Sequence, residues 1–223
     1  MLLEDNFRTI VEAIAEGRQL FRNLQLSFTY VMATHIPLVV TAALIPLAGY
    51  PLLYLPVHII WLEMLIHPTA LLVFQELPAG ELRPIERSLR PRFFSPREWL
   101  VIVVAGVVVT LLVTAGYLRS YQTGEVEHGR AMAMAVLTIA SATITAVLSG
   151  MRTRMSWYIV VATAALGLLL IQVGPLAQRL GLTPLHGDDW ALAVAANLVT
   201  AAVLVAGELW TQQARERQKA APA

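Results

Sequence analysis

The stretch that decides the fold runs from Leu52 to Pro78 and reads LLYLPVHIIWLEMLIHPTALLVFQELP. A helix needs about 20 mostly apolar residues to cross a bilayer, and this stretch is long enough. Near its middle it carries one acid, Glu63, and one histidine, His67, followed directly by Pro68. An ionisable group at that depth costs at least ~2.5 kcal/mol on insertion scales, so such groups usually face a bundle interior and mark an ion path. The stretch therefore predicts a membrane span with polar groups beside a proline.

The composition extends this prediction to the whole chain. Hydrophobic residues make up 57% of the 223 residues and charged residues only 14%, which is typical of a polytopic membrane protein. The sequence contains no cysteine, so disulfides and thiolate metal sites are excluded. We predict an all-α membrane protein with six transmembrane helices, near residues 27–48, 54–75, 99–118, 131–149, 157–174 and 190–210.

The first 26 residues differ from the spans because charges alternate with apolar residues at helical spacing. They predict an amphipathic stalk helix that continues without a break signal into the first span. A helix lying on the membrane surface is the alternative. Residues 27–210 are then the six-helix membrane domain, and residues 211–223 form a tail.

The positions of the basic residues predict the orientation. Under this topology 13 of the 16 Lys and Arg residues fall on one side of the membrane. They precede the first span, follow the last span, or lie between spans two and three and between spans four and five. Because positive loops stay in the cytoplasm, both termini are predicted to be cytoplasmic.

Three segments resemble one family. The opening EDNFRTIVEAIAEGRQLFRNL is similar to the stalk that becomes the fifth transmembrane helix of P-type cation-transporting ATPases. The segment LPVHIIWLEMLIHPTALLVFQELP resembles the sixth helix of the bacterial members, and LRPIERSLRPRFFSPREWL resembles the cytoplasmic loop after it. The resemblance implies that the chain is the C-terminal membrane module of such a pump, in the bacterial inner (plasma) membrane.

The motifs that the resemblance places upstream are missing. The aspartyl-phosphate motif DKTG and the hinge motif GDGxNDxP do not occur in the sequence. We therefore expect that the chain does not hydrolyse ATP alone, that it holds no cofactor, and that ATP and Mg act on domains outside it. The expected partners are the lipid bilayer and the N-terminal half of a P-type ATPase, with no nucleic acid. An orphan membrane protein that binds or regulates a partner, or a nonfunctional gene remnant, is the alternative.

The resemblance also implies where an ion would bind. The family's ion-binding positions fall near His35 and Leu38 on the first span, and near Glu63, Ile66 and His67 on the second. Carboxylates are missing at Leu38 and His67, so the oxygen cage that calcium requires is incomplete. What remains is a tentative metal or ion site of unknown cation, formed by His35, Glu63 and His67 with hydroxyls from Thr34, Thr41 and Thr69.

These residues leave two interpretations open. Glu63 and His67 are four residues apart and share a helical face, so they can form a structural pair that only fixes packing. Imidazoles with one carboxylate also suit a transition metal or a proton better than calcium. Pro37 and Pro68 are expected to break their helices beside this site. The remaining histidines are predicted to be interfacial or solvated: His58, His128 and His186.

Overall fold

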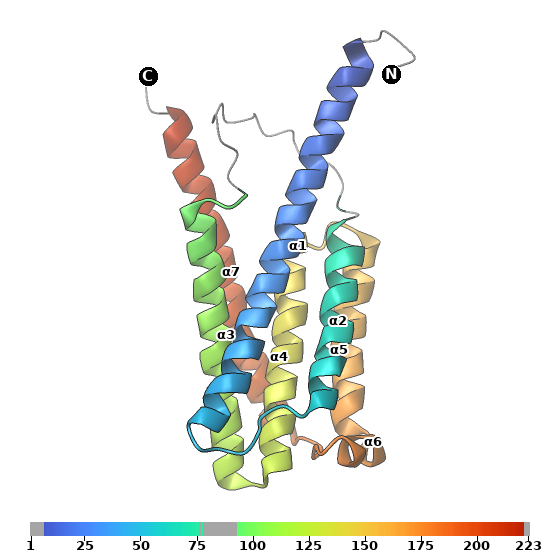
Figure 1. Ribbon diagram of the computed structural model, residues 1–223, viewed down its shortest axis with the longest axis vertical. Coiled ribbons are helices and arrows are strands. Elements are labelled where there is room, and N and C mark those ends of the chain that lie inside the picture. The colour runs from blue at the N-terminus through green and yellow to red at the C-terminus, as the bar shows by residue number, and fades with distance from the viewer. Residues whose placement is uncertain (1–6, 76, 78–92, 221–223) are drawn as a thin grey trace.

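The computed structural model describes residues 7–75, 77 and 93–220, and within these residues it is built from helices alone (Figure 1). Six helices are long and apolar enough to cross a membrane, which confirms the predicted class. A seventh, short helix was not predicted from the sequence. The helices are α1 (Phe7–Leu47), α2 (Pro56–Phe74), α3 (Pro96–Thr123), α4 (Val126–Ser149), α5 (Arg154–Gln172), the short α6 (Gly174–Arg179) and α7 (Gly187–Ala220).

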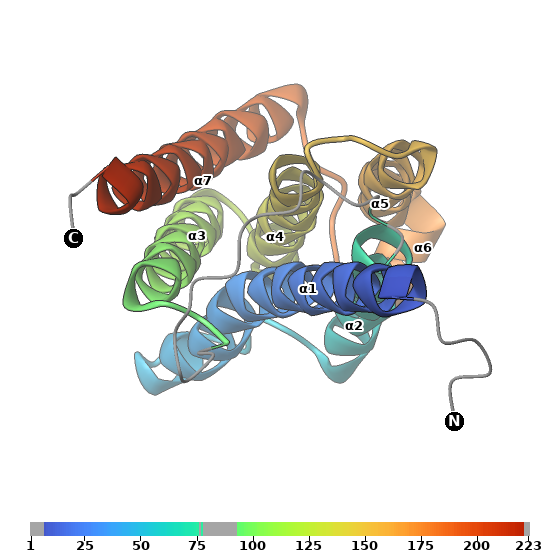
Figure 2. The same cartoon turned by 90° about the horizontal axis from the view of Figure 1, so that it is seen from above.

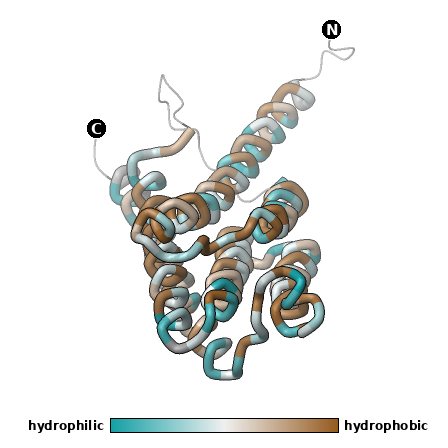
Figure 3. The backbone as a smooth tube through the Cα atoms, turned by 60° about the horizontal axis from the view of Figure 1, so that its bottom comes forward, coloured by the Kyte–Doolittle hydropathy of each residue, from teal (hydrophilic) through white to brown (hydrophobic). Residues whose placement is uncertain are grey.

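The predicted stalk and the first span form one continuous helix, α1, of 41 residues. Figure 3 shows hydrophobic and hydrophilic residues alternating along its projecting part, as expected for an amphipathic stalk. At the other end of the chain α7 continues through most of the predicted tail, to Ala220. Residues 1–6 of the stalk, residues 221–223 and most of the predicted basic loop, 78–92, lie outside the described residues.

The predicted helix breaks at Pro37 and Pro68 are wrong, because α1 and α2 both continue through their prolines. A proline removes one hydrogen bond, and membrane helices tolerate this where neighbouring helices and hydroxyl groups support the backbone. The carbonyl that Pro37 leaves free belongs to Ala33, one turn earlier, whereas the Thr41 hydroxyl, one turn later, donates to the Pro37 carbonyl over 2.6 Å. Each helix therefore lacks one backbone hydrogen bond at its proline but remains continuous.

Helix α4 forms the centre of the bundle. Its span is 72% buried, whereas no other span exceeds 39%. Seen from above, α1, α3, α5 and α7 are arranged around it (Figure 2). On the α1 side, the Tyr30 hydroxyl and the Ser141 hydroxyl of α4 lie 2.7 Å apart. The core is thus organised on α4, with α1 packed directly against it.

Three glycines allow helices to approach closely, as small residues commonly do in membranes. A Cβ atom at Gly106 of α3 would lie 2.7 Å from the Ile36 side chain of α1. At Gly167 of α5 it would lie 2.6 Å from Thr138 of α4. A Cβ atom at Gly207 of α7 would lie 2.8 Å from the side chain of Val101 on α3. Each of these contacts depends on the absence of a side chain.

The stalk part of α1 is bonded to the end of α2. The Asn23 amide nitrogen donates to the carbonyls of Gln75 and Leu77, over 3.1 and 3.2 Å. Gln19 donates to the same Leu77 carbonyl and to the Asn23 side chain. These carbonyls follow the last residue of α2, Phe74, and have no partner inside the helix, so the two amides satisfy groups that would otherwise need water.

The other end of α2 is fixed by His58, which was predicted to be interfacial and is instead buried. Its Nδ1 atom accepts a hydrogen bond from the Leu55 backbone N–H, and its Nε2 atom lies 2.7 Å from the Leu180 carbonyl. Because a carbonyl only accepts, Nε2 carries the proton. His58 therefore joins the start of α2 to the loop after α6.

Both termini lie at the same end of the bundle, and the α1–α2 and α3–α4 connections lie at the opposite end (Figure 1). Large apolar side chains are exposed along the outer faces of the helices, among them Leu111, Tyr158 and Leu198. An exposed apolar surface of this extent is expected where lipid is the solvent. The chain is accordingly a multi-pass membrane protein.

Candidate functional site

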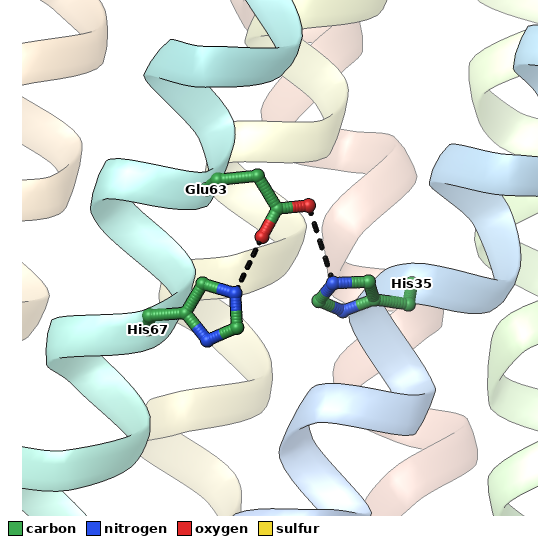
Figure 4. A group of neighbouring side chains, drawn as sticks. All are labelled: His35, Glu63 and His67. Atoms are coloured by element: carbon green, nitrogen blue, oxygen red, sulfur yellow. Dashed lines mark ion pairs between the residues drawn. The ribbon is translucent and has the colours of Figure 1, made fainter.

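His35, Glu63 and His67 converge between α1 and α2 (Figure 4). The Glu63 carboxylate lies between the two rings: its Oε1 atom is 3.2 Å from His35 Nε2, and its Oε2 atom is 2.7 Å from His67 Nε2. The ring centroids of the two histidines are 5.9 Å apart. One ligand atom from each residue falls within 4.8 Å of the others, which is close enough for all three to face one ion.

The hydrogen bonding of His35 fixes which of its nitrogens carries a proton. Its Nδ1 atom lies 2.9 Å from the Val31 carbonyl, one turn earlier on α1. A carbonyl accepts only, so Nδ1 is the donor, and the Nε2 atom of a neutral His35 ring directs a lone pair at Glu63. A lone pair and a carboxylate oxygen at 3.2 Å repel each other. The contact is favourable only when a proton or a cation lies between them.

The second carboxylate oxygen of Glu63 is in a similar position. Glu63 Oε2 is buried from solvent and makes no hydrogen bond of acceptable geometry, although His67 Nε2 is only 2.7 Å away. The two atoms are therefore close but poorly aligned. A shielded, poorly bonded carboxylate oxygen is costly in an apolar setting, and a shared cation would relieve that cost.

The hydroxyl groups predicted to join the site are directed elsewhere. Thr34 Oγ1 donates to the Tyr30 carbonyl and Thr69 Oγ1 to the Leu65 carbonyl, each on its own helix. Both residues are buried. Leu38 and Ile66, at the remaining implied positions, are buried apolar residues of the core. The site that the structure brings together thus consists of the two histidines and the glutamate.

The ligand atoms of this site favour transition-metal ions over calcium. Calcium takes six to eight oxygen ligands, and here three side chains offer two nitrogens and one carboxylate. Two imidazoles and a carboxylate suit Zn²⁺ and related transition-metal ions, which accept three protein ligands and complete their coordination with water. A proton held between the carboxylate and one imidazole is the other species that fits.

The site is open on one side. The side chains of His35 and Glu63 are 26% and 30% exposed, whereas that of His67 is 61% exposed. Its neighbours Met64 and Leu71, on the same helix, are exposed as well. An imidazole facing lipid on this scale is expensive, so this face of α2 has the character of a surface that another helix covers.

A second group of polar residues was missed. His128, predicted to be solvated, has a side chain only 15% exposed, and its Nε2 atom lies 3.2 Å from Asp189 Oδ2. His186 is 79% exposed, in line with its prediction, yet its Nδ1 atom lies 3.6 Å from the same oxygen. His186 and Asp189 are three residues apart, but His128 is far from both in sequence, so no local spacing could have revealed that it joins them.

Comparison with known proteins gives a consistent result. The family model described as "Cation transporting ATPase, C-terminus" matches residues 51–212. The chain is 24% identical to "Calcium-transporting ATPase 1" of Bacillus cereus over 89% of its own length, and 21% identical to the "Calcium-transporting ATPase" of Bacillus subtilis over 96%. A "Probable calcium-transporting ATPase" of Trypanosoma brucei brucei is 31% identical over 53% of the chain and 12% of that relative. The matched part is 26% and 25% of the two Bacillus proteins, so the chain spans about a quarter of their length.

Proposed function

Since the chain belongs to the family of cation-transporting ATPase C-terminal segments, we propose that it forms part of the ion path of a P-type cation pump. It corresponds to the C-terminal membrane half of such an enzyme, as the matched relatives indicate. The observation that carries the proposal is the Glu63 carboxylate, placed inside the membrane domain with an imidazole beside each of its oxygens. An ionisable cluster at that depth marks an ion pathway.

The proposed substrate is a divalent transition-metal ion, held by His35, Glu63 and His67. The relatives are named calcium-transporting ATPases, but the donor set here favours a different ion. Two ligands of a tetrahedral Zn²⁺ ion, each about 2.0–2.1 Å from the metal, lie about 3.4 Å apart. The 3.2 Å between Glu63 Oε1 and His35 Nε2 is close to that value. Thr34 and Thr69 support the two helices and are not proposed as ligands.

The proposed partner is the N-terminal half of a P-type ATPase, inserted in the same bilayer. The exposed His67 and its apolar neighbours would be covered by helices of that half. ATP and Mg would act there, on domains that this chain does not contribute. We further propose a location in the bacterial inner membrane with both termini in the cytoplasm, because 13 of the 16 Lys and Arg residues fall on one side of the membrane under the six-span topology.

The test is ATP-driven ion uptake by inside-out membrane vesicles from the organism of origin. Vesicles from cells that produce the unaltered chain are compared with vesicles from cells that produce Glu63→Gln at the same level. We expect uptake of Zn²⁺ or Mn²⁺ that depends on ATP and is lost in the variant. The matched control is Glu127→Gln, which removes one carboxylate at the far end of the bundle and should leave uptake unchanged.

Three results would contradict the proposal. Equal uptake of every ion in wild-type and Glu63→Gln vesicles would remove Glu63 from any ion path. Uptake of Ca²⁺ alone, still sensitive to Glu63→Gln, would keep the pump and reject the transition-metal ion. Proton movement without metal uptake would assign the site to a proton.

A further inference from the structure

His128, His186 and Asp189 bring three metal-ligating side chains together at the end of the bundle opposite the termini. His128 lies in the first turn of α4, His186 directly precedes α7, and Asp189 lies in the first turn of α7. One ligand atom from each residue falls within 4.8 Å of the others. This cluster is far from the ion path, on different helices, and the proposed pump function does not use it.

The longer of the two distances in this cluster fits a shared ion better than it fits a hydrogen bond. His186 Nδ1 lies 3.6 Å from Asp189 Oδ2, which is too long for a hydrogen bond. His128 Nε2 lies 3.2 Å from the same oxygen. Two ligands of a tetrahedral Zn²⁺ ion lie about 3.4 Å apart, so both separations are close to what ligands of one ion require.

The ligand atoms are held in place before any ion arrives. The backbone N–H of His186 donates to Asp189 Oδ2 over 3.0 Å, which orients the carboxylate. Hydrogen bonds of this kind fix metal ligands and raise their affinity. His128 and Asp189 are each only 15% exposed, whereas His186 is 79% exposed. The cluster therefore has two fixed ligands and one that reaches in from solvent.

The local charge also favours a cation. The segments 124–130 and 185–190 contain four carboxylates and one arginine, Arg130, whose Nε atom donates to the Leu52 carbonyl. The N-termini of α4 and α7 lie at the same place and reduce this negative charge, since each helix N-terminus acts as roughly half a positive charge. The four carboxylates exceed the arginine by three negative charges, which is more than the roughly one positive charge of the two helix N-termini together.

We propose that His128, His186 and Asp189 form a second metal site, which binds a divalent transition-metal ion of the Zn²⁺ type and joins the start of α4 to the start of α7. Three protein ligands leave room for water in the remaining position. The ion is a structural ligand here, at a site separate from the transported ion.

The test uses the full chain in detergent, stripped of metal, in a His35→Gln/His67→Gln background that removes the imidazoles of the first site. Zn²⁺ is titrated by calorimetry, and Co²⁺ by its visible absorption, which is much stronger in a tetrahedral site than in water. We expect one Zn²⁺ per chain and an intense Co²⁺ spectrum. Loss of a hydrogen-bond partner of a ligand already lowers metal affinity about 10- to 100-fold, so loss of a ligand in Asp189→Asn or His128→Gln should lower it at least as much.

Asp188→Asn is the matched control, because Asp188 is the exposed neighbour in the same turn and carries the same charge. The side-chain oxygen of asparagine can accept the same hydrogen bond from the His186 backbone N–H, so Asp189→Asn keeps the start of α7 intact, which helical circular dichroism can verify. Equal Zn²⁺ affinities for Asp188→Asn and Asp189→Asn would overturn the proposal, because general attraction by acidic groups would then explain the binding. Absence of stoichiometric Zn²⁺ binding in the background chain would overturn it as well.

Discussion

Glu63, His35 and His67 are linked by direct contacts, because the Glu63 carboxylate lies between the two imidazole rings. The lone pair of His35 Nε2 faces one Glu63 oxygen, and the other oxygen is buried and poorly bonded. Placing a proton or an ion on any of these atoms changes what is favourable at the rest. The three residues therefore behave as one unit, and their contributions to stability should not add.

A double-mutant cycle measures this coupling. Glu63→Leu and His35→Leu each leave a shielded polar group without its partner, so each should destabilise the chain by about 1–3 kcal/mol. The double variant should cost less than the sum, with a coupling of about 0.5–3 kcal/mol. Thermal unfolding of the chain in detergent gives all four values. Met64→Leu is the control, because Met64 is exposed on the same helix and its replacement should change little. Strict additivity would mean that the pair is not coupled.

The sequence could predict the cluster of His35, Glu63 and His67, but it could not predict the surroundings of His58 and His128. The reason is the sequence distance to their partners. Glu63 and His67 are four residues apart on one helix, and the family resemblance supplied His35. His58 and His128 have partners on remote elements: the carbonyl of Leu180, 122 residues further along, and the carboxylate of Asp189. The sequence neighbours of the two histidines give no sign of these remote partners, so the shielding of both side chains comes from tertiary packing alone.

At the level of helices, apolar length predicted six spans, but their mutual packing depends on particular side chains. The short helix α6, Gly174–Arg179, lies between the fifth and sixth spans and was not predicted from the sequence. The sequence also did not show which of its glycines meet another helix. Gly167 meets Thr138, whereas a Cβ atom at Gly17, on the stalk, would meet nothing within 4 Å.

The contact between α5 and α4 makes a testable prediction. Gly167→Ala places a Cβ atom 2.6 Å from Thr138 Cγ2, and overpacking of this kind costs typically about 1–3 kcal/mol. Adding Thr138→Ala removes the clashing methyl and should restore most of the lost stability, as measured by thermal unfolding in detergent. Gly17→Ala is the control and should stabilise the exposed helix by up to about 1 kcal/mol. Failure of Thr138→Ala to rescue would show that the clash lies elsewhere.

For the whole molecule, six spans put both termini at one end of the bundle (Figure 1). The helix arrangement alone does not say which end faces the cytoplasm, because both ends carry loops. Charge supplies the direction: 13 of 16 basic residues fall at the end with the termini under this topology. The orientation is therefore a prediction from sequence that the fold is compatible with.

Cysteine labelling checks the orientation, since the chain has no cysteine of its own. Ser88→Cys lies in the connection between α2 and α3, and Gln122→Cys lies at the exposed far end of α3. A membrane-impermeant maleimide added to intact cells should label Gln122→Cys and not Ser88→Cys, and inside-out vesicles should give the reverse. The opposite pattern would invert the topology.

The bonds between the stalk and the end of α2 have a mechanical consequence. Asn23 and Gln19 bond the carbonyls of Gln75 and Leu77, directly after α2, and residues 48–55 join the two helices at the other end. We therefore expect a rotation of the stalk to move α1 and α2 together. His35 on α1 and Glu63 on α2 would then keep their contact during this movement. Such a movement would not separate His35 from Glu63, but it would change the surroundings that the two side chains face. We therefore expect access to the site to change on the exposed side of His67.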